Sequence, residues 1–322
     1  MSRRSIVLFI VLSVAVVALF VIDLAAGSVR IAPDMIWAAL TGGDCPAATA
    51  KIIIDIRLVK AVAALLAGAA LSVSGLQMQT LFRNPLAGPY VLGISSGAGL
   101  GVALVVLAGI GSSLGIVGAA WAGSAVVLFI IAAVGRRIKD IMVILILGMM
   151  FSSAVGAIVQ ILQYLGNETS LKAYIIWTMG SLGDVTLSRL WVMLPAVLVG
   201  LFLAVLAIKP LNLLLFGEEY AVSMGLDLRR SRCLLFASTT LLAGTITAFC
   251  GPIGFVGLAM PHVTRMLFAD SDHRILVPAT MLTGAAVMIL CDVISKMFTL
   301  PVNAITALLG IPVVVWVVLR NK

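Results

Sequence analysis

Charged residues are scarce in this chain of 322 residues, since Asp, Glu, Lys and Arg together make up only 11% of it. A soluble domain carries about 25% charged residues, so this chain cannot cover a water-soluble surface of its size. The scarcity excludes a cytosolic enzyme. The 62% of hydrophobic residues excludes a disordered chain. What remains is a polytopic membrane protein.

Cysteine and histidine are also rare. The four cysteines, Cys45, Cys233, Cys250 and Cys291, are scattered and lack a Cys-x-x-Cys spacing. This excludes a secreted disulfide scaffold, and we interpret the cysteines as packing residues, because free Cys is usually a small buried hydrophobe. With only two histidines and no pairing at metal spacing, we expect no metal site on this chain.

The chain also lacks the Gly-Lys-Ser/Thr sequence that cradles nucleotide phosphates. Any ATP that powers it must therefore be hydrolysed by a separate chain. The stretch Gly93-Ile94-Ser95-Ser96-Gly97 matches the nucleophile elbow of serine hydrolases, but that elbow requires a preceding strand and a nearby histidine. Its flanks here are apolar helix, so we predict no catalytic residue. An intramembrane hydrolase stays a remote alternative.

Long apolar runs are what the chain has instead. A spanning helix needs about 20 apolar residues. Ten runs approach this length, at residues 6–26, 58–76, 90–110, 116–134, 141–165, 190–208, 233–250, 253–267, 275–294 and 302–319. An amphipathic segment at 33–40 and an interfacial segment at 171–187 lie between them. We predict an all-α fold with about ten transmembrane helices, in one domain that spans residues 1–322.

Basic residues are distributed unevenly around these runs. The net charge of +8 could indicate nucleic acid, but the charges lie in short loops, so we predict no such partner. With the amino terminus in the cytoplasm, 14 of the 21 basic residues fall inside. Seven fall outside: Arg30, Lys51, Arg57, Lys60, Lys172, Arg189 and Lys296. Because Lys and Arg are retained inside, both termini are predicted to be cytoplasmic.

Small residues crowd several runs. Ala64, Gly68, Ser72 and Gly75 lie close to one helical face, and glycines 93, 97 and 101 recur every four residues. In lipid, such spacing indicates close helix packing. The packing partner could lie within the chain or in a second copy, and the sequence leaves both open.

Ionisable residues are nearly absent from the interior of the predicted spans, where ion-coupled transporters usually keep them. Asp23 and Asp292 come closest to the interior. Asp292 precedes Lys296 by four residues, which predicts a local ion pair on one helix face. This pattern argues against an ion-coupled secondary transporter, which stays the alternative function.

The longest polar stretch, residues 209–232, contains a predicted short helix of about two turns. Glu218 and Glu219 suit a helix start and Gly225 suits a helix stop. Ala221, Met224 and Leu228 are spaced to line one side of it. An apolar stripe on a loop helix needs a partner.

Several motifs together resemble the FecCD/BtuC-type permease subunits of bacterial ABC importers for siderophores, haem and cobalamin. The matching stretches include Ile56-Arg57-Leu58-Val59-Lys60, Arg83-Asn84-Pro85-Leu86-Ala87, Trp177-Thr178-Met179-Gly180-Ser181-Leu182, the 217–228 loop, the 251–265 stretch, Asp272-His273-Arg274 and the 300–312 stretch. The resemblance runs from about residue 20 to the C-terminus, in the family's order and spacing.

The resemblance implies a transport subunit of the bacterial inner membrane, which carries a metal chelate and binds no cofactor itself. Two ATPase subunits that hold ATP and Mg, a periplasmic or lipid-anchored binding protein, a second permease copy and membrane lipid are the implied partners. Gly217, Glu218, Glu219, Ala221, Met224, Gly225 and Leu228 match the coupling segment that enters the ATPase.

The resemblance also implies a cytoplasmic gate and a docking site. Asn84, Pro85 and Leu86 match the gate, and Ile141 and Met142 fall at its second part, where they match poorly in chemistry. Arg57, Lys60 and Lys296 match the outer positions whose basic groups receive carboxylates of the binding protein. Two of the three are Lys, which cannot make the planar two-point pairing of Arg, so weaker or more salt-dependent docking is expected.

Overall fold

The structure is a computed structural model that describes residues 2–27, 29–107, 113–135, 137–138 and 140–320. Three basic residues that entered the topology count, Arg136, Lys139 and Lys322, lie outside this part, as does the end of the predicted run 90–110. Within the described residues, every regular element is a helix. The all-helical prediction is thereby confirmed.

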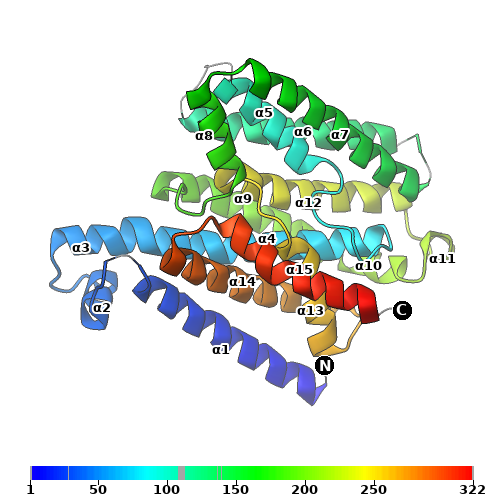
Figure 1. The fold of residues 1–322 in the computed structure, drawn as a ribbon. Coiled ribbons are helices and arrows are strands. Elements are labelled where there is room, and N and C mark those ends of the chain that lie inside the picture. The colour runs from blue at the N-terminus through cyan, green and yellow to red at the C-terminus, as the bar shows by residue number, and fades with distance from the viewer. Residues whose placement is uncertain (1, 28, 108–112, 136, 139, 321–322) are drawn as a thin grey trace.

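The helices in chain order are α1 (Arg3–Ala25), α2 (Pro33–Thr41), α3 (Ala47–Lys51), the π-helical η1 (Ile52–Leu58), α4 (Val59–Leu81), α5 (Ile94–Leu107), α6 (Ser113–Gly135), α7 (Ile141–Leu165), α8 (Glu168–Thr178), α9 (Leu187–Leu206), α10 (Ile208–Leu214), α11 (Glu218–Ser223), α12 (Leu228–Cys250), α13 (Val256–Phe268), α14 (His273–Phe298) and α15 (Val302–Arg320). The long helices run roughly along one direction (Figure 1). Both termini and α11 lie at one end of the bundle, and α2 and α3 lie at the other.

Six described helices are long and apolar enough to cross a membrane: α1, α6, α7, α9, α12 and α14. The helices α5 and α15 are apolar but shorter. The second predicted run proves longer than expected, because α3, η1 and α4 follow one another without a break from Ala47 to Leu81. This chain is a multi-pass membrane protein.

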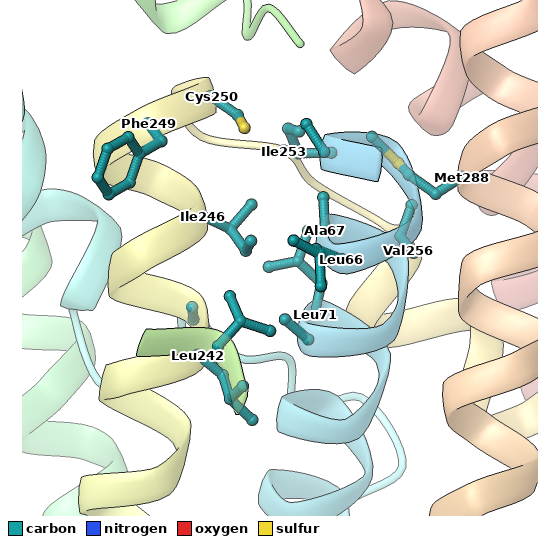
Figure 2. Packing of buried hydrophobic residues seen from close by; sticks show 14 of the residues in the cluster. Leu66, Ala67, Leu71, Leu242, Ile246, Phe249, Cys250, Ile253, Val256 and Met288 are labelled. Carbon is teal, nitrogen blue, oxygen red and sulfur yellow. The ribbon is translucent and has the colours of Figure 1, made fainter. Parts of the chain in front are cut away.

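The centre of the bundle is α4, which is buried along nearly its whole length. Figure 2 shows Leu66, Ala67 and Leu71 of α4 facing Leu242 and Ile246 of α12. Polar side chains join the same two helices: Gln77 donates to Ser238 over 3.0 Å and accepts from Thr239 over 2.8 Å. The core is therefore held by apolar contact together with satisfied polar groups.

Glycines let the neighbouring helices approach α4 and α5 closely. A Cβ at Gly68 would lie 2.2 Å from the backbone oxygen of Gly284, and one at Gly75 would lie 1.5 Å from that of Gly257. Gly97 opposes Gly123 in the same way. The small residues that the sequence singled out thus serve packing within the chain.

The eighth predicted run is broken, as its glycines and prolines indicate. Residues 251–255 form an irregular segment, and α13 follows it. Gly251 has φ +74°, and a Cβ there would lie 2.4 Å from the backbone oxygen of Trp177. The Tyr90 hydroxyl accepts from the Ile253 amide, so the broken backbone is satisfied within the protein.

The interpretation of all four cysteines as packing residues is wrong in one case. Cys250 and Cys291 are buried, whereas Cys233 is exposed near the start of α12. Its neighbours Arg229 and Arg230 are exposed as well, since the first turns of α12 lie at the end of the bundle that carries α11.

Candidate coupling site and charge cluster

The helix α11 is bounded by two glycines in left-handed conformations. Gly217 precedes it with φ +102° and Gly225 follows it with φ +85°, and both values suit glycine. Glu218 and Glu219 lie in its first turn, where negative charge complements the helix dipole. The start and stop signals are confirmed, although α11 has six residues and is shorter than two full turns.

The predicted apolar stripe of α11 is wrong in its membership, because its three residues do not share a surface. Ala221 is fully buried and Leu228 packs against the same cluster of the protein's own core, while the Met224 side chain is 58% exposed. The exposed apolar residues here are Phe216, Tyr220, Val222 and Met224. We call this set the exposed face of α11. The rings of Phe216 and Tyr220 lie 5.4 Å apart.

An ion pair fixes α11 to α12. The Arg232 guanidinium donates to both carboxylate oxygens of Glu218 over 2.6 Å, and Arg232 is buried. Pairs of this two-point kind are stronger and more directional than single hydrogen bonds. Asp227 caps the start of α12 by accepting the Arg230 amide over 3.0 Å. Nothing in the sequence indicates that Arg232 pairs with Glu218, 14 residues before it.

A cavity of about 1110 Å³ opens beside α11, between α6 and α12. Its lining includes apolar Ile138 and Phe236, three carboxylates and three guanidinium groups. Within the described residues, no group of three or more His, Cys, Asp or Glu side chains gathers to hold a metal ion. The cavity is therefore a mixed-charge recess next to the exposed face of α11.

The predicted gate residues Asn84, Pro85 and Leu86 lie in the loop 83–93 between α4 and α5, which we call the gate loop, and short-range contacts stiffen it. The Asn84 side chain accepts the Leu86 amide over 2.9 Å, and the Leu86 side chain is exposed. The backbone oxygen of Pro85 lies 2.7 Å from a ring nitrogen of His262 in α13. His262 thus attaches the gate loop to α13, which gives it a packing role with a defined partner.

One apolar cluster joins the predicted coupling helix to both predicted gate segments. Ala221 of α11, Phe82 and Ala87 of the gate loop region, and Ile141 at the start of α7 are all buried in it. Met142 is exposed and Asp140 caps α7 through the Met142 amide. The structure therefore brings Ala221 and Ile141 together, which their spacing in the sequence does not reveal.

At the opposite end of the bundle, four charged side chains form a buried chain of ion pairs. Lys60 lies 3.1 Å from Asp292, Lys296 lies 2.9 Å from Asp292, and Lys296 lies 2.8 Å from Asp23. Both carboxylates are fully buried. We call these residues the charge cluster. The predicted pair of Asp292 and Lys296 is present, within a network that also includes α1 and α4.

The three basic residues implied as docking positions, Arg57, Lys60 and Lys296, do not form an exposed basic surface on this chain. Arg57 is buried and donates to the backbone oxygens of Leu24, Ala25 and Val29, where it caps the end of α1. The Lys296 side chain is 9% exposed and lies between two carboxylates, and the Lys60 side chain is 20% exposed. Burial follows from the carboxylates, because Asp23 and Asp292 neutralise cations that would otherwise face water.

Comparisons with known proteins agree with this architecture. A family model described as the FecCD transport family matches residues 15–320. The vitamin B12 import system permease protein BtuC of Klebsiella pneumoniae is 39% identical over 279 residues, which cover 83% of this chain and 82% of the relative. The protein of the same name from Citrobacter koseri is 35% identical over 330 residues, covering 100% of this chain and 96% of the relative.

A solved structure shares the fold. It is described as an inward-facing conformation of a metal-chelate type ABC transporter, and it is 29% identical to this chain. The superposition has a TM-score of 0.87 and covers 98% of this chain and 99% of the other.

Proposed function

The chain belongs to the FecCD transport family, and we propose that its cargo is cobalamin. It is a permease subunit of an ATP-binding-cassette importer of the metal-chelate and cobalamin class, and it is not an enzyme. Its partners therefore include ATPase and substrate-binding subunits and a permease dimer. The implied membrane is the bacterial inner membrane.

Among the candidate cargoes, the relatives favour cobalamin over haem and over an iron–siderophore. The two relatives named above, at 39% and 35% identity over most of the chain, are vitamin B12 permeases. The test is uptake of labelled cyanocobalamin by cells that carry this permease with its neighbouring ATPase and binding-protein genes. Uptake of an iron–siderophore with no uptake of cobalamin would overturn the cargo and leave the importer class intact.

We propose ten membrane-spanning segments with both termini in the cytoplasm. The segments are α1, the continuous α3–η1–α4, α5, α6, α7, α9, α12, α13, α14 and α15. Two observations support this arrangement: the excess of basic residues on the inner side, and the position of both termini at the same end of the bundle as α11 (Figure 1). The end that carries α2 and α3 would then face the periplasm.

The exposed face of α11 is the proposed ATPase contact, one on each of two permease copies. Exposed apolar groups on a short loop helix beside charged groups are typical of a docking surface. The apolar cluster behind Ala221 would pass its movement toward the gate residues Asn84, Pro85, Leu86, Ile141 and Met142. The observation that carries this proposal is the division of α11 into a buried Ala221 and an exposed Met224.

A pair of methionine substitutions tests the ATPase contact. Met224→Arg should weaken ATPase binding about tenfold or more, because it places a charge in an apolar interface. Met35→Arg is the matched control, since Met35 is 40% exposed on α2 at the other end. ATPase recovered with the purified permease is the measurement. Equal recovery from both variants would refute the contact. Ala221 is unsuitable for this test because its substitution would disturb the core.

Docking of the binding protein is proposed at the end that carries α2 and α3. Of the three basic residues implied by the family resemblance, only Lys60 reaches the surface in part, so it stays a docking candidate. Arg57 donates to backbone oxygens at the end of α1, and Lys296 is ion-paired with Asp23, so both side chains already have partners within the chain. An ion-coupled mechanism is disfavoured, because Asp23 and Asp292 are both paired with lysine.

A further inference from the structure

Four polar side chains interlock where α10, α14 and α4 meet, at the end of the bundle that carries α11. The Asn212 carbonyl oxygen accepts from the backbone amide and from ring Nδ1 of His273, each over 2.8 Å. The Asn212 amide donates to Asp272 over 2.7 Å. The other ring nitrogen of His273, Nε2, lies 2.9 Å from the Thr80 hydroxyl. We call these four residues the polar hub.

The polar hub is a built arrangement in which each ring nitrogen of a fully buried histidine has a partner. His273 is completely inaccessible to solvent, and Thr80 is buried. Asp272 also caps α14 through the Arg274 amide over 2.8 Å, and this contact holds the pKa of Asp272 below its usual value. Removing one partner would leave a buried polar group unsatisfied, so the arrangement has a single favoured geometry.

The position of the polar hub along the chain connects it to α11. Asn212 belongs to α10, which leads through Leu215, Phe216 and Gly217 directly into α11. A second attachment of α11 is the Glu218–Arg232 ion pair to α12, and α12 is itself hydrogen-bonded to α4 through Gln77. The route through α10 differs because its hydrogen bonds reach both α14 and, through His273, α4.

Beyond the hub, α4 packs closely against both α14 and α13. Gly68 and Gly284 bring α4 and α14 into backbone contact, and Gly75 does the same for α4 and α13. Gln79 of α4 donates to the Leu258 backbone and accepts from Arg265 over 2.6 Å. The gate loop then continues directly from α4 and is attached to α13 by His262. A displacement of α10 would therefore carry the gate loop with it.

We propose that the polar hub of Thr80, Asn212, Asp272 and His273 transmits ATPase-driven movement of α11 to the α4–α14 pair and so to the gate loop. This inference rests on the proposed ATPase contact of α11. The four residues of the polar hub are positioning residues, since they act through α4 and touch neither cargo nor nucleotide. Loss of the hub should leave the ATPase bound and active but disconnected from the gate.

The experiment measures movement at the end of α4 directly. Leu86→Cys is introduced as a reporter in a background that carries Cys45→Ser and Cys233→Ser. The permease is purified with its ATPase, and the rate of reaction with a water-soluble maleimide is compared with and without ATP plus vanadate. In the background protein we expect the nucleotide to change this rate by at least about fivefold, as in ordinary allosteric coupling.

Matched variants separate transmission from stability. Thr80→Val removes the hydroxyl at nearly constant shape, and Asn212→Leu removes the link to α10; each should abolish the nucleotide-dependent change in labelling rate while retaining ATPase binding and hydrolysis. Thr80→Ser keeps the hydroxyl and should keep the response. Thr283→Val removes another buried inter-helix hydroxyl, 2.8 Å from Thr264 and remote from α10, and should also keep the response.

The outcomes distinguish the inference from the proposed function. An unchanged response in both Thr80→Val and Asn212→Leu, with ATPase bound, would overturn the inference alone. Equal loss in Thr283→Val would overturn it too, because general loosening would then explain the result. Failure of the background permease to retain any ATPase would overturn the proposed ATPase contact and, with it, this inference.

Discussion

Replacement of Lys296 by Met tests whether the charge cluster holds the fold together or serves as a docking site. The Lys296 ammonium lies 2.8 Å from Asp23 and 2.9 Å from Asp292, and both carboxylates are fully buried. Lys296→Met leaves Asp23 with no ion-pair partner from the cluster and Asp292 with Lys60 alone. Removal of one partner from a buried ion pair costs about 3–5 kcal/mol, which lowers the folded-to-unfolded ratio by a factor of roughly 10² to 10³ or more.

Unfolding of the purified permease in detergent measures this cost. Lys51→Met is the control, because Lys51 is exposed on α3 at the same end, and it should shift stability by less than about 0.5 kcal/mol. The double variant Lys296→Met with Asp23→Asn should recover part of the loss, since the buried carboxylate without a cation is then gone. Recovery in this cycle identifies the ion pair as the source of the effect.

The opposite pattern would refute the reasoning. Suppose that Lys296→Met has the same free energy of unfolding as the unsubstituted protein, while its affinity for the binding protein falls about tenfold. Lys296 would then be a docking residue and not a structural one. The burial of the charge cluster would then not describe the working transporter. A loss of stability with unchanged docking affinity supports the structure.

Two further substitutions test the helix contacts. Gly75→Ala should destabilise the protein by more than the usual 1–3 kcal/mol of overpacking, because the new Cβ would lie 1.5 Å from a backbone oxygen of α13. In the control Gly156→Ala, the new Cβ meets nothing within 4 Å, so stability should be unchanged or slightly higher. Thermal unfolding of both variants is the measurement. Arg232→Ala should release Glu218 and lower the free energy of local unfolding of α11 by about 1.5–3 kcal/mol. Proteolysis measures this change, since cleavage within residues 217–228 should become roughly tenfold faster or more. Cleavage at the original rate would contradict the prediction.

Much of the fold could be predicted from apolar runs and turn residues, because these act locally. Gly217 and Gly225 bound α11 where the sequence placed a start and a stop. The glycines and prolines of 251–265 favour a broken helix, and residues 251–255 are indeed irregular. The length of the second span was underestimated, since Asp55 and Arg57 interrupt an apolar count although they lie within the continuous helix from α3 to α4.

The sites were harder to predict because their partners are distant in the sequence. Ala221 and Met224 share a helical stripe by spacing, and only the position of the core decides that one is buried and the other exposed. The sequence does not reveal that Lys60 pairs with Asp292 or that Lys296 pairs with Asp23, because these partners lie on other helices. His273 and Asn212, 61 residues apart, carry no motif that links them.

The charge cluster also sets an order for the assembly of the chain. Asp23 enters the membrane with the first helix, whereas its partner Lys296 is made 273 residues later. Few other side chains anchor α1: Ser5, Val16 and Leu24 are buried along it, and Arg57 of η1 caps its end. Until α14 has been made and inserted, α1 is therefore held in place mainly by the Arg57 cap, and the Asp23 carboxylate has no lysine to neutralise it.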